Sequence, residues 1–157
     1  MLCEKHRINK KGGRFSMVFV SHSSAQTEQI GRQLAARLYP GSVVALYGGL
    51  GMGKTAFVRG LASGLDVDAK EVSSPTFALV HEHNGRLPLF HFDMYRVSGW
   101  DDLESTGFFD YLQRSGVVAL EWSENVEGAL PEDAIHVTIA PGEGTDDRII
   151  TILPDQS

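Results

Sequence analysis

A glycine-rich segment that ends in lysine and threonine has the residue types of a phosphate-binding loop. The segment Gly48-Gly49-Leu50-Gly51-Met52-Gly53-Lys54-Thr55 matches the pattern G-x-x-x-x-G-K-[S/T] in full. In this pattern the glycines let backbone amides turn inward around phosphate, the lysine reaches the β- and γ-phosphates, and the threonine hydroxyl binds Mg²⁺. An apolar run over residues 42–47 predicts a strand before it, and a helical stripe follows it. Because this order is the context that the pattern requires, the segment from Gly48 to Ala56 is predicted to bind a nucleotide, with a chance glycine-rich turn as the alternative.

Two carboxylates are candidates for organising the metal and the attacking water at such a site. Glu121 follows the apolar residues 117–120, which predict a buried strand. Parallel strands present their carboxyl ends to the ligand crevice, so Glu121 is predicted to be a metal ligand. Asp93 lies on the polar face of the alternating residues 87–95 and is the second candidate. A solvated strand-end glutamate and a turn or cap aspartate are the structural alternatives.

The segment Ser73-Ser74-Pro75-Thr76 has a structural and a functional interpretation. Pro75 favours an extended approach to the next strand, so the segment can be a simple turn. Alternatively, it is a loop whose Thr76 hydroxyl senses the γ-phosphate and the metal. The adenine pocket is placed near the start of the first predicted helix, around Ser24. Trp122 is interpreted as a core residue, with stacking on a base as the alternative.

Three histidines raise the question of a zinc site. His81 and His83 share one face of a predicted strand. If Asn84-Gly85 forms the hairpin turn, residue 91 pairs with residue 78, which directs His91 to the opposite face. We therefore expect solvated histidines in the hairpin, and we interpret His91 as a structural or site-orienting residue rather than a metal ligand.

The rest of the pattern predicts the strands and helices that position these residues. Strands are expected over residues 17–21, 42–47, 76–84, 87–95, 116–122, 134–140 and 148–153. A helix capped by Ser23 or Ser24 is predicted to reach about Tyr39, and a second helix runs from the glycine-rich segment to Gly64. Residues 100–114 predict one or two short helices broken near Gly107. The mixture indicates an α/β fold whose sheet is part parallel and part antiparallel.

The composition fits one globular domain. The chain has 157 residues, of which 42% are apolar and 22% charged, and it has one cysteine. A single cysteine excludes an internal disulfide and a thiol metal cluster. The apolar runs are too short for a transmembrane helix, so we expect no membrane association and a cytoplasmic location.

The net charge of −6 is distributed unevenly along the chain. Residues 1–16 carry five basic residues and one acidic residue, whereas residues 98–157 carry two basic and thirteen acidic residues. We interpret residues 1–16 as a disordered basic extension or an over-early start, with an RNA-binding arm as the alternative, and residues 17–157 as the single domain. The acidic segment repels phosphate backbones, so it is expected to be a solvated or partner-facing surface.

Four segments occur in an order and at spacings that resemble the TsaE family of bacterial ATPases. They are the glycine-rich segment, Ser74-Pro75-Thr76, His91-Phe92-Asp93-Met94-Tyr95-Arg96 and Leu120-Glu121-Trp122. The resemblance covers about residues 21–153 and implies a three-layer α/β fold of the P-loop NTPase type. It implies that ATP is bound with Mg²⁺ and hydrolysed weakly, in support of threonylcarbamoyladenosine formation beside the anticodon of tRNA. It also implies TsaD-type and TsaB-type partners, through which the chain meets tRNA only indirectly.

The resemblance also assigns roles to individual residues. Lys54 and Thr55 take the phosphate and metal roles, and Thr76 takes a switch-like role. Asp93 takes the catalytic role, and Glu121 takes that of a metal ligand.

At one position the sequence departs from the family pattern. Many relatives have a second threonine after the motif, where this chain has Ala56. One hydroxyl near the α-phosphate is therefore absent, which affects affinity more than γ-phosphate chemistry.

Other nucleotide-dependent functions remain as alternatives. A small-molecule P-loop kinase needs an arginine-rich lid, but the seven arginines after Met17 are scattered. A GTPase is disfavoured because the guanine motifs Asn-Lys-x-Asp and Thr-Lys-x-Asp do not occur. A nucleotide-gated binding subunit with incidental turnover is the alternative from another class.

Overall fold

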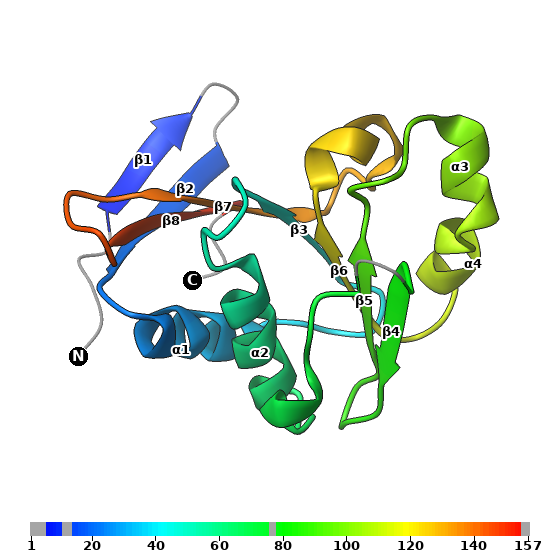
Figure 1. Ribbon diagram of the computed structural model, residues 1–157, viewed down its shortest axis with the longest axis horizontal. Coiled ribbons are helices and arrows are strands. Elements are labelled where there is room, and N and C mark those ends of the chain that lie inside the picture. Colours follow the sequence, from blue (N-terminus) through cyan, green and yellow to red (C-terminus); the bar gives the residue numbers. More distant parts are fainter. Residues whose placement is uncertain (1–5, 11–13, 76–77, 155–157) are drawn as a thin grey trace.

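The computed structural model describes residues 6–10, 14–75 and 78–154, and one eight-stranded sheet runs through this part of the chain (Figure 1). Its strands are β1 (His6–Lys10), β2 (Arg14–Ser21), β3 (Val43–Tyr47), β4 (Val80–His83), β5 (Leu89–Asp93), β6 (Val117–Glu121), β7 (Ile135–Pro141) and β8 (Arg148–Leu153). Their order across the sheet is β1-β2-β8-β7-β3-β6-β5-β4. The four strands β7, β3, β6 and β5 are parallel, and the remaining pairings are antiparallel.

Helices cover both faces of the sheet, which gives three layers (Figure 1). They are α1 (Ser24–Ala35), α2 (Lys54–Gly64), α3 (Trp100–Ser105) and α4 (Phe108–Leu112), with the 3₁₀ helices η1 (Ala69–Glu71) and η2 (Ser123–Ala129). Apolar residues of α1 and α2 form one core with the sheet, and a second core of α3, α4 and η2 fills the other face. The predicted mixed α/β fold with three layers is confirmed.

The two helices on the first face touch through their backbones. Gly60 of α2 lies against α1 so closely that a Cβ atom there would overlap the backbone carbonyl of Glu28. Gly31 of α1 is placed the same way against the carbonyl of Phe57. Because glycine is the residue type without a Cβ atom, these two positions allow the close approach. The contact fixes α2, and hence the loop that precedes it, relative to α1.

The parallel strands bring the functional segments to one edge of the sheet. β3 pairs with β6, and β6 pairs with β5, all in the same direction. Their carboxyl ends therefore lie side by side, and Asp93 is directly opposite Glu121 in the register. The glycine-rich loop, residues 48–53, leaves this edge from the end of β3. Ligand sites of open α/β sheets form at such an edge.

The predicted register of the β4–β5 hairpin is wrong. His81 is opposite His91, and His83 is opposite Leu89, so five residues connect the strands instead of two. The loop is held by α2, because the amide of Arg86 donates to the carbonyl of Leu65 at 2.8 Å. This tertiary contact overrides the two-residue turn that Asn84-Gly85 favours. As a result, the three histidines share one face of the sheet, contrary to the prediction.

The other predicted elements differ mainly at their ends. Helix α1 begins with Ser23 as its N-cap, as predicted, but ends at Ala35 rather than near Tyr39. The strand expected over residues 76–84 is described only as β4, and residues 76–77 lie outside the described part. The short helices α3 and α4 are separated at Gly107, whose φ of +78° favours glycine, as expected.

Two strands of the amino-terminal segment pair with each other in the described residues. β1 pairs with the start of β2 from Lys10↔Arg14 to His6↔Val18. Among the described residues, no helix is both long and apolar enough to cross a membrane.

The helix contact makes a prediction about stability. We expect Gly60→Ala to lower the free energy of unfolding by about 1–3 kcal/mol, because overpacking against Glu28 outweighs a gain in helix propensity of about 1 kcal/mol. Thermal melting checks this, at about 2–4 °C per kcal/mol. Gly128→Ala is the matched control, since a Cβ there meets no atom within 4 Å. An unchanged melting temperature for Gly60→Ala would contradict the backbone contact.

Candidate functional site

The glycine-rich loop is shaped by three residues with positive φ. These angles are +152° at Gly48, +76° at Gly51 and +103° at Gly53, which side chains with a Cβ rarely adopt. Gly53 is the N-cap of α2, and no side chain caps this helix. The first amides of α2 therefore point out of the helix end beside the loop, where an anion finds donors and a favourable dipole.

Lys54, the first residue of α2, is held against the loop and an aromatic ring. Its Nζ atom donates to the carbonyl of Gly48 at 2.6 Å and lies 3.9 Å from the centroid of the Trp122 ring. Only 5% of the residue is exposed. Burial lowers the pKa of Lys54 and outweighs the nearby carboxylates, chiefly Glu121, which act to raise it. The Gly48 carbonyl and the Trp122 ring therefore hold the ammonium group, and an anionic ligand can replace both contacts.

Glu121 and Asp93 form the acidic side of the site, and each is 4% exposed. The Oγ1 atom of Thr55 donates to Oε1 of Glu121 at 3.4 Å, and Nε2 of His91 donates to Oε2 of the same carboxylate at 2.5 Å. The carboxylate of Asp93 accepts from the hydroxyl of Ser74 at 3.4 Å. It also accepts from the backbone amide at position 95 at 2.9 Å. These hydrogen bonds hold the two carboxylates at the neighbouring carboxyl ends of β5 and β6.

Both carboxylates line a cavity of about 770 Å³. Its wall also includes residues 50–56 of the loop and the start of α2, together with Ser74, Tyr95 and Trp122. The rings of Tyr95 and Trp122 are 5.0 Å apart, and Trp122 has a φ of +58°, unusual for a large side chain. Its backbone turns the ring from the end of β6 toward Lys54. Ring and cation together close the side of the cavity.

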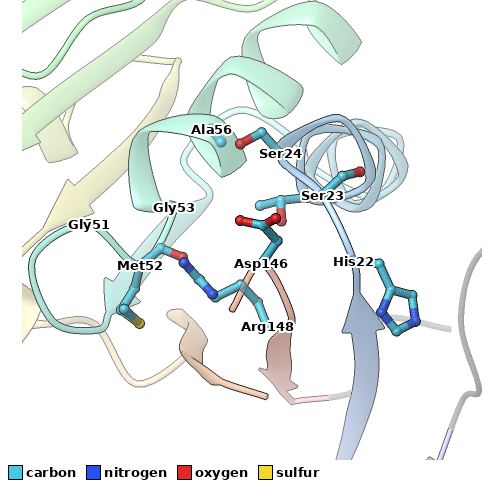
Figure 2. A pocket seen from close by; sticks show the side chains of 10 residues that line it. His22, Ser23, Ser24, Gly51, Met52, Gly53, Ala56, Asp146 and Arg148 are labelled. Carbon is cyan, nitrogen blue, oxygen red and sulfur yellow. The ribbon is translucent and has the colours of Figure 1, made fainter. Parts of the chain in front are cut away.

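A second cavity of about 270 Å³ adjoins the first at Ser24 and the loop. It lies between the start of α1, the loop and the β7–β8 turn, as Figure 2 shows. Arg148 extends from β8 toward Met52, and its Nε atom donates to the carbonyl of Met52 at 3.2 Å. On the outer side, Nδ1 of His22 contacts Oδ1 of Asp147 at 2.7 Å. Strand β8, which is distant in the sequence, therefore supports the glycine-rich loop through Arg148.

The structure brings most of the predicted site residues to these cavities. Lys54, Thr55, Asp93 and Glu121 line the larger cavity, and Ser24 lines both. Gly48 and Gly49 shape the loop but do not line either cavity. Thr76, predicted to sense the γ-phosphate, lies outside the described residues.

Several residues of the site were not predicted as such. Arg148 is a lone arginine with no motif around it, so its contact with Met52 has no local signal. Tyr95 and Arg59 were not selected either, although both line the larger cavity. Trp122, interpreted as core, is part of that cavity as well as of the apolar cluster on its side of the sheet. Its position directly after Glu121 at a strand end was the available signal.

The site has a donor set that suits Mg²⁺ rather than zinc. Its oxygen atoms come from Thr55 and Glu121, and Asp93 is opposite Glu121 in the strand register. Within the described ranges no group of three or more His, Cys, Asp or Glu side chains is arranged to hold a metal ion. Mg²⁺ fits such a sparse set, because it usually takes one or two protein oxygens and completes its shell with phosphates and water.

Comparisons with known proteins agree on one family. The sequence model of the family described as "Threonylcarbamoyl adenosine biosynthesis protein TsaE" matches residues 21–150. The chain is 40% identical over 120 residues to the tRNA threonylcarbamoyladenosine biosynthesis protein TsaE of Treponema pallidum, covering 76% of this chain and 88% of that protein. It is 40% identical over 127 residues to the protein of the same name from Bacillus subtilis, covering 80% and 78%. The crystal structure of YdiB from Bacillus subtilis aligns with a TM-score of 0.70 at 33% identity, covering 88% of this chain and 85% of that chain.

The contact of Arg148 predicts a loss of stability on substitution. We expect Arg148→Met to lower the free energy of unfolding by about 1–3 kcal/mol, because the carbonyls of Met52 and Thr145 lose a charged donor. Urea denaturation measures the change. Arg37→Met, at an exposed position after α1, is the control and should leave the midpoint unchanged. Equal midpoints for the two variants would argue against the role of Arg148 as a support of the loop.

Proposed function

The chain belongs to the TsaE family, which acts in tRNA threonylcarbamoyladenosine biosynthesis, and from this premise we propose that it is a Mg²⁺-dependent ATP-binding protein with weak ATPase activity. One observation carries the proposal. Lys54, Thr55, Asp93 and Glu121 converge on a single cavity of about 770 Å³ beside the amino-terminal end of α2. That volume lies within the usual range for small-molecule sites.

The phosphates of ATP are proposed to bind at the glycine-rich loop. The uncapped amides at the start of α2 supply donors, and Lys54 supplies the positive charge. Lys54 would exchange its contacts with the Gly48 carbonyl and Trp122 for the β- and γ-phosphates. Its low exposure means that little water has to be displaced around the ammonium group. Thr55 and Glu121 would hold Mg²⁺, which neutralises phosphate charge when bound.

Asp93 is proposed to orient the water that attacks the γ-phosphate. Its carboxylate is fixed by Ser74 and by the amide of Tyr95, so its direction at the cavity wall is defined before substrate arrives. Ser74 belongs to the segment that ends in Thr76, and its hydroxyl therefore links that segment to the site. We propose that the γ-phosphate and Mg²⁺ of bound ATP hold residues 74–76 at the site and that cleavage releases them.

The adenine ring is proposed to occupy the second cavity, beside Ser24 and Arg148 (Figure 2). This cavity adjoins the phosphate site along the loop, so one nucleotide can extend through both. Ala56, which has no hydroxyl, lines both cavities. The position would contact the ligand without donating a hydrogen bond to it.

The proposed partners are a TsaD-type and a TsaB-type protein, with tRNA met through their complex. Residues 98–157 carry thirteen acidic and two basic residues, and such a surface repels the phosphates of tRNA. An accessory ATPase that leaves tRNA contact to its partners fits this charge distribution.

The catalytic role of Asp93 predicts a selective loss of turnover. We expect Asp93→Asn to reduce ATP hydrolysis in the presence of the partners by about 100-fold or more, because the uncharged amide orients the attacking water more weakly than the carboxylate does. Binding of ATP, measured by titration, should persist. Asp102→Asn is the control, since this acid is exposed on α3 and its carboxylate accepts from Ser98. Near-normal turnover of Asp93→Asn would refute the assignment.

A second measurement separates a hydrolytic cycle from nucleotide-gated binding. We expect a non-hydrolysable ATP analogue to support assembly with the partners but no more than one round of tRNA modification. If repeated rounds proceed with the analogue, turnover is incidental and the chain is a binding subunit.

A further inference from the structure

The carboxylate of Glu121 is held from two sides by different residues. On one side Oε1 accepts from the hydroxyl of Thr55, toward the cavity. On the other side Oε2 accepts from Nε2 of His91, a side chain with no exposed surface. The shorter bond, at 2.5 Å, is the one on the buried side, against 3.4 Å to Thr55. The orientation of this carboxylate therefore depends on His91 more than on Thr55.

Among the described residues, His91 makes a hydrogen bond only through its Nε2 atom. Its Nδ1 atom is buried without a hydrogen-bond partner in the described ranges. The bond from Nε2 to Glu121 is therefore the one hydrogen bond that the imidazole makes among these residues. An apolar side chain would fill the interior of β5 without leaving a polar atom unpaired. The presence of a histidine at this buried position is therefore explained by its hydrogen bond to Glu121.

We propose that His91 is a positioning residue that holds Oε2 of Glu121 and thereby keeps Oε1 directed at Thr55 and the cation site. The inference rests on the proposed function, since it concerns the residue assigned to Mg²⁺. A free carboxylate rotates about its terminal bond and offers either oxygen in changing directions. A donor fixed in the sheet removes this freedom, which is how residues behind metal ligands commonly raise affinity.

The neighbouring His83 offers a matched control. It lies on the same face of the β4–β5 pair, is buried, and has an Nε2 atom without a hydrogen-bond partner in the described part of the chain. Its contact with an acidic group is to Glu71, at 3.9 Å from Nδ1, and not to Glu121. A substitution at His83 therefore disturbs the same layer without touching the carboxylate of the site.

The test is the Mg²⁺ concentration that gives half-maximal binding of a non-hydrolysable ATP analogue. Binding is followed by the fluorescence of Trp122 in a Trp100→Phe background, so that one tryptophan reports. We expect His91→Asn to raise this concentration about tenfold or more, because its amide is too short to reach Glu121. His91→Gln, whose amide nitrogen takes the place of Nε2, should restore the wild-type value. His83→Asn should not change it.

A double substitution shows whether His91 acts through Glu121. In a Glu121→Ala background, His91→Asn should cause no additional shift, because the group that it positions is gone. An equal shift for His91→Asn and His83→Asn, or a shift that persists without Glu121, would overturn the proposal. Melting temperatures without nucleotide establish that each variant is folded, and His91→Leu replaces His91→Asn if the latter is not.

The wild-type protein distinguishes this inference from the function on which it rests. If it binds no ATP analogue, or binds it without any effect of Mg²⁺, the proposed function and the role of His91 are both refuted. If it binds with a clear Mg²⁺ dependence that His91→Asn leaves unchanged, only the role of His91 is refuted.

Discussion

Parallel pairing of β3, β6 and β5 is the constraint on which the site depends. Because the three strands run in the same direction, their carboxyl ends deliver the glycine-rich loop, Glu121 and Asp93 to one edge of the sheet. The cores on both faces keep this arrangement rigid, and the backbone contact of Gly31 and Gly60 ties α2 to α1. The positions of the polar groups at this edge therefore depend on apolar packing elsewhere in the molecule.

The charged groups at this edge are largely buried, and each is held by a specific partner. Burying a charge without a partner is costly, so the ammonium of Lys54 lies on a carbonyl and an aromatic ring, and Glu121 accepts from Thr55 and His91. Glu121 is thus oriented before a ligand arrives, whereas Lys54 is held by contacts that the proposed phosphates would replace. The carboxylate of Asp93 likewise accepts a hydrogen bond from the hydroxyl of Ser74.

Local spacing predicted the loop, the strand-end acids and the α/β class, because each depends on residues close together in the chain. The β4–β5 register could not be predicted, since the amide of Arg86 binds Leu65 of a distant helix end and lengthens the turn. The contact of Arg148 with the loop could not be predicted either, because the two segments that it joins are almost a hundred positions apart in the chain. The shared face of the histidines follows from the same register, and it became apparent only with the strand pairing.

The contact between β8 and the glycine-rich loop also sets the order in which the site can be completed. The loop and α2 are synthesised well before residue 148, and β3 has β7 as one of its neighbours in the sheet. A nascent chain that lacks β7 and β8 therefore has the glycine-rich segment but neither the strand that neighbours β3 nor the arginine that contacts the loop. The glycine-rich loop therefore gains these two supports only after the last two strands of the sheet have been synthesised.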